Sequence, residues 1–172
     1  MRGSIEIACF KGGKSLAHIN KSYSVINELL VNIFNDILLI EQSALQKGKF
    51  SDLSVTEIHT IAAIGMYDPR NMSEVASDLK ITVGTLTSAA NRLINKGYVD
   101  RKRIVEDRRV VQIQLTKRGK LAYRIHEKFH NDMVKSTIDG LTDMEEKIII
   151  KSLDKLNNFF KYKYELKSNK KE

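Results

Sequence analysis

The chain has 172 residues, of which 42% are hydrophobic, so it is long enough to bury the core of about one domain. Its formal net charge is +8, and its single cysteine cannot form an internal disulfide, as is usual in a reducing compartment. No continuous apolar run approaches the ~20 residues that span a bilayer, and no basic leader precedes an apolar signal segment, so we expect a cytoplasmic protein with no membrane contact.

The first predicted element is a long helix near the N-terminus. Residues 1–19 are expected to be a disordered or vector-derived leader, because the chain opens with Met-Arg-Gly-Ser. From Lys21 to Lys47 apolar residues recur every three or four positions, which predicts an amphipathic helix that ends at Gly48. Its apolar stripe is wide, which favours burial against more than one neighbour.

Three shorter helices are predicted next. The Ser54 to Glu57 spacing is that of a capping box, so a helix begins there and ends at Gly65. The next two helices are short and separated by a brief turn. Ser73 is placed to cap the first, through residue 79, and Thr82 the second, to about residue 96. The second has one apolar face and one small, polar face, which is typical of the recognition helix of a helix-turn-helix.

The pattern then changes to the period of two that is typical of strands. Residues 98–104 and 111–115 predict two strands, with residues 105–109 as the hairpin between them. A hairpin that follows a helix-turn-helix is a wing. Thr116 then caps a long helix to about residue 139, and Thr142 with Glu145 forms a capping box for a last helix to about residue 166. The expected fold class is mainly α with a small β-wing, a winged helix-turn-helix with long terminal helices.

The positive charge of the chain is concentrated in this region. Between Lys80 and Lys120 there are eleven Lys or Arg residues against three Asp or Glu residues, which accounts for the whole net charge of +8. Charge focused in one place favours a polyanionic partner, with nucleic acid as the default. A general nucleoid protein would need such charge without a base-reading helix, and the small polar face of the predicted recognition helix argues against that class.

Specific contacts to DNA can be assigned on this helix and on the wing. Asn91 has the geometry to pair with adenine, Arg92 can bind guanine or phosphate, and the small hydroxyl residues can contact phosphates or thymine methyl groups. Arg108 and Arg109 lie at the predicted wing tip, where a guanidinium can enter the minor groove. The candidate DNA-binding residues are Thr82, Thr85, Thr87, Ser88, Asn91, Arg92, Arg108 and Arg109.

These segments resemble a known family. The stretch TVGTLTSAANRLINKGYVDR and the wing EDRRVVQIQLTKRG are similar to the MarR family of bacterial transcription regulators, and the resemblance covers roughly residues 20–164. It implies a homodimer joined through an N-terminal helix at 20–50 and C-terminal helices at 118–166, with a DNA-binding domain at 51–117 and a tail at 167–172. Two recognition helices would then meet successive major grooves of palindromic double-stranded DNA, ~34 Å apart.

Within the family, three segments are similar to the repressors of bacterial type II fatty-acid synthesis genes: NIFNDILLIE, LSVTEIHTIAAIG and YRIHEKFHNDMVKSTIDGLTD. This similarity implies a long-chain acyl-acyl carrier protein as co-repressor, and the basic face can also dock the acidic carrier protein. The apolar residues that can line a tunnel for the acyl chain are Phe34, Ile37, Leu38, Ile58, Ile61, Ala62, Phe129 and Met133.

Regulation by zinc or another small ligand is the alternative. His126 and His130 are one helical turn apart, His59 lies in the second predicted helix, and Glu41 or Glu127 can add a carboxylate. Zinc-sensing relatives use histidines from equivalent helices. However, these histidines fall inside the segments that resemble the fatty-acid repressors, so their presence does not favour zinc. Partly buried histidines bonded to backbone or carboxylate groups are the simpler interpretation.

Redox sensing and catalysis are less well supported. Redox-sensing relatives keep their reactive cysteine inside the first helix, whereas Cys9 lies upstream of it. The sequence has no Ser/His/Asp arrangement, Gly-rich phosphate loop or clustered carboxylates at catalytic spacing. We therefore expect a regulator without catalytic residues or a cofactor.

Overall fold

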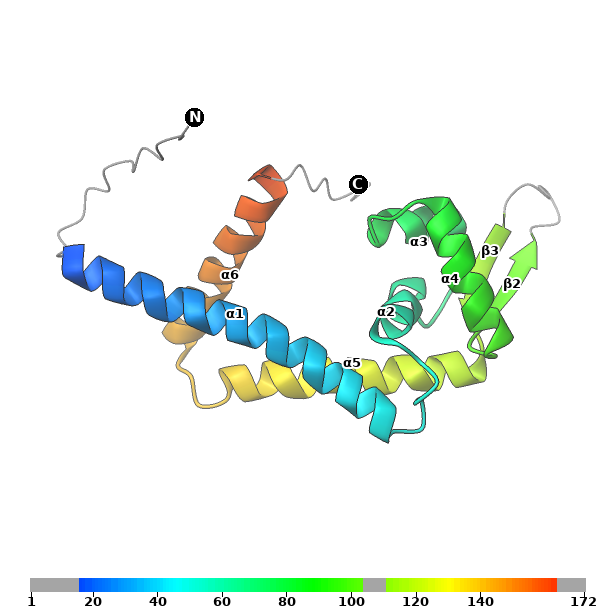
Figure 1. The fold of residues 1–172 in the computed structure, drawn as a ribbon, viewed down its shortest axis with the longest axis horizontal. Helices are drawn as coiled ribbons and strands as arrows, with labels where there is room; N and C mark the ends of the chain where they lie inside the picture. The colour runs from blue at the N-terminus through cyan, green and yellow to red at the C-terminus, as the bar shows by residue number, and fades with distance from the viewer. Residues whose placement is uncertain (1–15, 104–110, 164–172) are drawn as a thin grey trace, which may run out of the picture. The chain divides into compact units, whose positions relative to one another are not determined.

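The structure is a computed structural model that describes residues 16–103 and 111–163. It separates into two units, residues 1–44 and residues 45–172. The helices and strands follow one another along the chain as the colours of Figure 1 show. Their bounds are α1 Leu16–Lys47, α2 Val55–Ile64, β1 Arg70–Asn71, α3 Met72–Asp78, α4 Val83–Asn95, β2 Val99–Arg103, β3 Val111–Leu115, α5 Lys117–Ile138 and α6 Asp143–Lys163.

The long helix α1 accounts for most of the N-terminal unit. It begins at Leu16, inside the segment expected to be a leader, and ends at Lys47 next to Gly48 as predicted. Large apolar side chains remain exposed along it, among them Leu29, Phe34 and Leu39. Within the described residues, α1 alone is long and apolar enough to cross a membrane by length and composition, which is weak evidence because the core helix of a soluble protein passes the same test.

The second unit begins with the predicted capping box. The backbone N–H of Ser54 donates to the Glu57 carboxylate at 2.9 Å, and the N–H of Glu57 donates to the Ser54 hydroxyl at 3.3 Å. These two bonds satisfy N–H groups that the first turn of α2 leaves without a helical partner. The helix ends at Gly65, whose φ of 80° lies in the left-handed region that glycine adopts without strain.

The start of α3 differs from the prediction. The helix is capped at Asn71, whereas the sequence interpretation placed the cap at Ser73. The carboxylate of Glu74 accepts from the backbone N–H of Asn71 at 3.3 Å and from its side-chain amide at 3.1 Å. Asn71 and Glu74 therefore have the capping-box spacing, and this pairing shifts the start of the helix. The short strand β1 was also missed, because two residues are too few to show a period.

The predicted wing strands are confirmed as an antiparallel pair. Val99 lies opposite Leu115 and Arg103 opposite Val111 in the β2–β3 ladder. Strand β1 pairs with the other edge of β3, so the strand order is β1-β3-β2. The hairpin expected at residues 105–109 lies outside the described residues.

The core of the second unit lies between α2, α3, α4, the sheet and the start of α5. The residues whose side chains are almost fully buried there are Ile58, Ile61, Ile64, Val75, Leu86, Leu93, Tyr98, Val99 and Ile113. Helix α5 is capped by Thr116, as predicted, and packs against α2. Gly119 in its first turn approaches the backbone of Tyr98 so closely that an added Cβ would overlap the Tyr98 carbonyl oxygen and lie 3.1 Å from the carbonyl carbon.

The last helix, α6, contributes nothing to this core. Thr142 and Glu145 form the predicted capping box, with the Thr142 N–H donating to the carboxylate at 2.8 Å. All of the described residues of α6 keep more surface than a core residue would. Leu153, for example, is 59% exposed. The end predicted near residue 166 lies beyond the described part of the chain.

Candidate nucleic-acid interface

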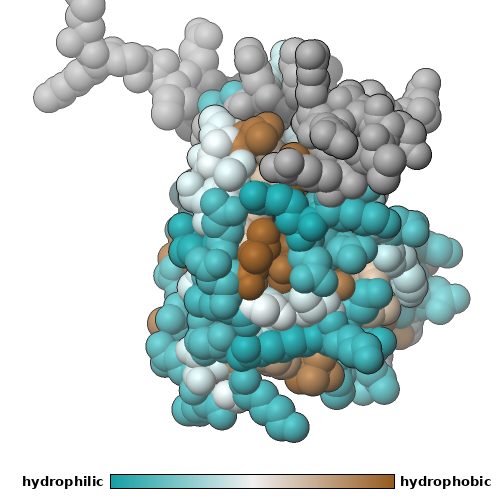
Figure 2. All heavy atoms as spheres, turned by 90° about the vertical axis from the view of Figure 1, so that its right-hand side faces the viewer, coloured by the Kyte–Doolittle hydropathy of each residue, from teal (hydrophilic) through white to brown (hydrophobic). Residues whose placement is uncertain are grey.

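The recognition helix α4 divides its residues between the core and the surface. Thr82 caps it, and its buried side chains are Leu86, Ala89, Ala90 and Leu93. The exposed positions include Thr82, Thr85, Ser88, Asn91 and Arg92, and Thr87 is half-buried at the edge. Figure 1 shows α4 and the two wing strands at the right of the picture, and Figure 2 shows that side face on. This face is mostly hydrophilic, with a small hydrophobic patch near its middle. The polar face that the sequence predicts is thus available to a partner.

The hydroxyl groups on this face already donate hydrogen bonds within the helix. Thr87 donates to the carbonyl of Val83 at 2.8 Å, and Ser88 donates to the carbonyl of Gly84 at 3.3 Å. A hydroxyl has only one proton to donate, whereas its oxygen can still accept. Phosphate oxygens only accept, so these two side chains are better suited to base-edge donors and to methyl contacts than to phosphates, contrary to one of the roles considered from sequence.

Asn91 is held by a residue from the wing. The guanidinium of Arg101 on β2 donates to the amide oxygen of Asn91 at 2.8 Å. That oxygen has a second lone pair, so adenine pairing through Asn91 remains chemically possible with Arg101 in place. In the sequence Arg101 counted only as one of the basic residues between Lys80 and Lys120. Its contact with Asn91 was missed, because a strand residue and a helix residue show no periodic relation.

A buried carboxylate fixes the C-terminal end of α4. Glu57 is 5% exposed and accepts from Lys96 at 2.7 and 2.9 Å, while the Arg92 side chain approaches it at 3.8 Å. Burial acts to raise the pKa of Glu57, but the hydrogen bonds from Lys96 and Ser54 outweigh it and lower the pKa. Lys96 therefore positions the helix, and Arg92, with 59% of its side chain exposed, can still reach a phosphate.

A second cluster joins the start of α5 to the core. The Arg118 guanidinium lies 4.3 Å from the centre of the Tyr98 ring and donates to the Asp52 carboxylate at 3.2 Å. The Tyr98 hydroxyl donates to Asp52 at 2.7 Å. The pKa of Tyr98 is raised mainly by burial and, to a smaller extent, by the Asp52 carboxylate. Arg118 is thus a structural cation. The wing residues Arg108 and Arg109, both candidate DNA contacts, lie outside the described residues.

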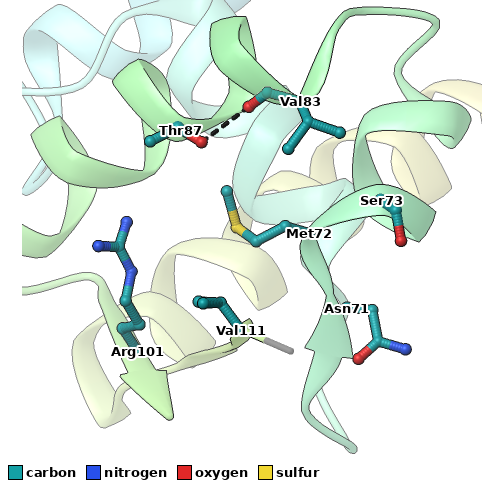
Figure 3. A pocket seen from close by; sticks show the side chains of 7 residues that line it. All are labelled: Asn71, Met72, Ser73, Val83, Thr87, Arg101 and Val111. Carbon is teal, nitrogen blue, oxygen red and sulfur yellow. Dashed lines mark hydrogen bonds between the residues drawn. The ribbon is translucent and has the colours of Figure 1, made fainter. Parts of the chain in front are cut away.

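A hollow of about 470 Å³ lies beside the recognition helix. Figure 3 shows the Met72 side chain reaching into it between Val83 of α4 and Val111 of β3, with Arg101 at one side. Thr87, whose hydroxyl bond to Val83 is drawn there, also lines it. Any molecule that entered this hollow would touch α4, through Val83 and Thr87, and the Arg101 side chain.

The residues expected to line an acyl tunnel fall into three groups. Ile58 and Ile61 are buried core residues of the second unit. Ala62, Phe129 and Met133 are partly exposed on α2 and α5. Phe34, Ile37 and Leu38 belong to α1, where Phe34 and Leu38 are more than half exposed. The tunnel itself remains a prediction.

The histidines considered for zinc come together in the second unit. His59 on α2 lies beside His126 on α5, with ring centres 5.4 Å apart, and His126 lies beside His130 at 4.5 Å. The spacing in α5 predicted the second contact. The first depends on how α2 packs against α5.

Comparison with known proteins places the chain in a family. The model of the MarR family matches residues 53–111. The transcriptional regulator SarZ of Staphylococcus saprophyticus is 33% identical over 63% of this chain and 70% of its own. The regulator PchR of Bacillus subtilis is 24% identical over 83% of this chain and 82% of its own.

Solved structures agree with these matches. The crystal structure of Streptococcus pneumoniae FabT in complex with DNA superimposes with a TM-score of 0.75 and 42% sequence identity, over 81% of this chain and 97% of that one. This match extends well beyond the segment matched by the family model. Together with the helix-turn-helix, the wing and the exposed polar face of α4, these similarities show that the chain belongs to the MarR family of transcriptional regulators.

Proposed function

We propose that this MarR-family DNA-binding transcriptional regulator is a dimeric repressor of type II fatty-acid synthesis genes, with long-chain acyl-acyl carrier protein as its co-repressor. The observation that carries the proposal is the 42% identity with FabT over 97% of that chain. The segments that resemble fatty-acid repressors in sequence fall in α1, α2 and α5, outside the recognition helix. The similarity therefore includes elements that do not read DNA, as a shared regulatory ligand would require.

DNA reading is proposed to centre on α4 and on its contact with the wing. Asn91, supported by Arg101, is the proposed base-reading residue, and Arg92 is a proposed phosphate or guanine contact. Thr82, Thr85, Thr87 and Ser88 supply acceptor oxygens at the same surface, and the three threonines also supply methyl groups. Arg108 and Arg109 remain proposed minor-groove contacts from their place in the sequence.

A homodimer is proposed because the terminal helices expose apolar surface. Phe34 and Leu39 of α1 are 57% and 67% exposed, and Leu153 of α6 is 59% exposed. Apolar surface of this kind is normally buried against another molecule. A second copy of the chain would cover it, and would place two recognition helices on a palindrome with half-sites ~34 Å apart.

The co-repressor is expected to use two kinds of surface. Its acyl chain requires an apolar cavity, for which Ala62, Phe129 and Met133 are the partly exposed candidates of the second unit. Its acidic carrier protein requires basic residues, and Lys117 at the start of α5 is exposed and available for that contact. Binding of the acylated protein strengthens repression only if it favours the DNA-binding state over the alternative.

Fluorescence anisotropy with a labelled palindromic, AT-rich duplex tests the proposal. We expect nanomolar-class affinity that falls steeply with salt, and much weaker binding to a shuffled duplex. Long-chain acyl-acyl carrier protein should tighten binding to the palindrome, whereas the unacylated carrier protein and Zn²⁺ should not. Equal affinity for both duplexes would disprove sequence-specific regulation. A palindrome preference that does not respond to acyl-acyl carrier protein would disprove the co-repressor and leave the DNA reading intact.

A further inference from the structure

The turn between α3 and α4 holds a lysine in an unfavourable backbone conformation. Lys80 has a φ of 55°, and within the described part of the chain the other residues with positive φ are all glycines, namely Gly65, Gly97 and Gly140. In the left-handed region the Cβ of any other residue comes too close to the following carbonyl oxygen, which glycine avoids because it has no Cβ. Lys80 therefore makes the fold less stable than glycine would at the same position.

The hydrogen bonds of this turn explain why the backbone is left-handed there. The N–H of Lys80 donates to the Ser77 carbonyl at 3.0 Å, and the N–H of Ile81 donates to the Ala76 carbonyl at 3.0 Å. These are the two bonds of a Schellman motif, which ends a helix with a left-handed residue that is usually glycine. The motif requires the backbone conformation but not the lysine side chain. The side chain therefore needs a separate explanation.

The ammonium group of Lys80 is available to a partner outside the chain. The residue is exposed. Within residues 16–103 and 111–163 it forms no ion pair, and the nearby Asp78 carboxylate instead binds Arg70 at 2.9 Å. Lys96 and Arg118, from the same basic stretch, are by contrast bound to carboxylates of the fold. A strained residue with no role inside the fold is typical of a functional site.

The surroundings of Lys80 suit a phosphate group. Lys80 lies two residues before Thr82, the cap of the recognition helix, and such a helix enters the major groove with its N-terminal residues. The hydroxyl oxygens of Thr82 and Thr85 are 2.8 Å apart, so their mutual bond uses one of two protons and leaves the other for an outside acceptor. Thr87 and Ser88 have already donated theirs within the helix. The surface next to Lys80 is thus the part of the polar face that can still donate to phosphate oxygens.

We propose that Lys80 binds a backbone phosphate of duplex DNA at the edge of the major groove, and that lysine occupies this glycine position for the sake of that contact. The contact is independent of base sequence, because a phosphate carries no sequence information. It adds the turn between α3 and α4 to the contacts proposed for α4 and the wing. The inference rests on the proposed reading of DNA by α4, which fixes the side of the molecule that faces the duplex.

Three substitutions separate the charge of Lys80 from its backbone strain. Lys80→Met removes the charge and keeps the strain, Lys80→Gly removes both, and Lys80→Arg keeps both. Fluorescence anisotropy is measured with the palindromic and the shuffled duplex at several salt concentrations. At about 150 mM salt, the Met and Gly variants should bind both duplexes roughly 5-fold more weakly for each chain bound, with a log–log salt slope that is shallower by about 0.9 per chain. Lys80→Arg should bind like the native chain.

Stability should change in the opposite direction from binding. In urea unfolding, Lys80→Gly should raise the midpoint because it relieves the left-handed strain, whereas Lys80→Met should leave it unchanged. The glycine variant would then be the more stable protein and the weaker DNA binder. Lys151→Met is the matched control, since it removes the same charge from an exposed position of α6 and should alter neither affinity nor salt slope.

The outcomes also distinguish this inference from the proposal on which it rests. A native chain that binds both duplexes equally would contradict the base reading by α4, whereas the effect of Lys80 on binding to either duplex would still be measurable. Native affinity and salt slope in both Lys80→Met and Lys80→Gly would overturn the phosphate contact. A loss confined to the palindrome would also overturn it, because the residue would then read bases. An unchanged urea midpoint in Lys80→Gly would overturn the claim that lysine destabilises the turn.

Discussion

The winged helix-turn-helix and the terminal helices use apolar residues in opposite ways. Ile61, Leu86 and Leu93 of the former are completely buried within one chain, whereas Leu39 of α1 and Leu153 of α6 are 67% and 59% exposed. All of these residues come from amphipathic sequence patterns of the same kind. The periodicity therefore identifies the apolar face of a helix, but it does not say whether the same chain or another molecule covers that face.

This contrast separates two sources of stability. The winged helix-turn-helix contains its own core, so it should fold at any protein concentration. If the proposed dimer is correct, the terminal helices instead depend on a second copy and their contribution depends on concentration. Substitutions in the two regions should therefore have effects of different kinds.

The largest expected effect comes from α6. Leu153→Glu would place a charge in the proposed dimer interface and should dissociate the dimer. A monomer has one recognition helix instead of two, so its affinity for the palindrome should fall by about 1,000-fold, the lower end of the difference between specific and non-specific binding. Light scattering after size exclusion and anisotropy measure the two effects. Lys151→Glu places a glutamate on nearly the opposite side of the same exposed helix and should be neutral. A dimer that survives Leu153→Glu would exclude α6 from the interface.

The next largest effect is expected when the same substitution, Gly→Ala, is compared at two positions of the winged helix-turn-helix. Gly119→Ala forces a Cβ into the Tyr98 carbonyl and should lower the free energy of unfolding by about 3 kcal/mol. In Gly84→Ala the nearest atom to the new Cβ is the Thr82 hydroxyl oxygen at 3.8 Å, so stability should stay the same or rise.

Urea unfolding compares the two variants, and DNA binding separates them further. Gly84→Ala should weaken DNA binding although the protein is folded, because Gly84 lies in the first turn of α4, where the backbone is expected to approach DNA. Equal stability of the two variants would contradict the close approach of α5 to Tyr98.

A smaller effect should depend on pH. The pKa of Glu57 is lowered in the folded state, so its ionised form stabilises the protein above the unfolded-state pKa of about 4.5, and this stability is lost as the pH falls through the folded-state pKa. Glu57→Gln should cost about 2 kcal/mol at pH 7, as charged hydrogen bonds do, and progressively less below pH 4.5. Urea unfolding from pH 7 to pH 3 measures this, with the partly exposed Glu146→Gln as control. A difference that does not change with pH would assign the effect to packing.

The smallest expected effect concerns base reading. Asn91→Ala should weaken binding to the palindrome by about 10-fold and leave binding to random DNA unchanged. Because Arg101 donates to Asn91, the effects of Asn91→Ala and Arg101→Ala should not add. A double-mutant cycle measured by anisotropy tests this coupling. If Asn91→Ala weakens both duplexes equally, another residue of α4 reads the bases.

Local features were predictable from the sequence because their partners lie close to one another along the chain. The capping boxes at Ser54 and Thr142 and the hairpin strands are confirmed. The same reasoning failed at α3, where both Asn71 and Ser73 are residue types that cap helices. The Glu74 carboxylate accepts hydrogen bonds from Asn71, so the helix begins after Asn71. Local rules were thus sufficient where a single set of signals was present.

Contacts between distant residues were not predictable in this way. Lys96 and Glu57 are 39 residues apart, and Tyr98 and Asp52 are 46 apart. From the sequence, Lys96 and Arg118 counted equally with the other basic residues of the stretch. The structure assigns both to intramolecular contacts and so reduces the number of cations available for a partner.

The sequence by itself determined the order of the elements, the concentration of positive charge in residues 80–120 and the resemblance to the MarR family, because these depend on neighbouring residues and composition. Only the tertiary structure decided which cations support the fold, that Arg101 holds Asn91, and that His59 joins His126 and His130. The physical reason is that a side chain's partner is set by how the chain packs on itself, and packing brings together residues that no local pattern connects.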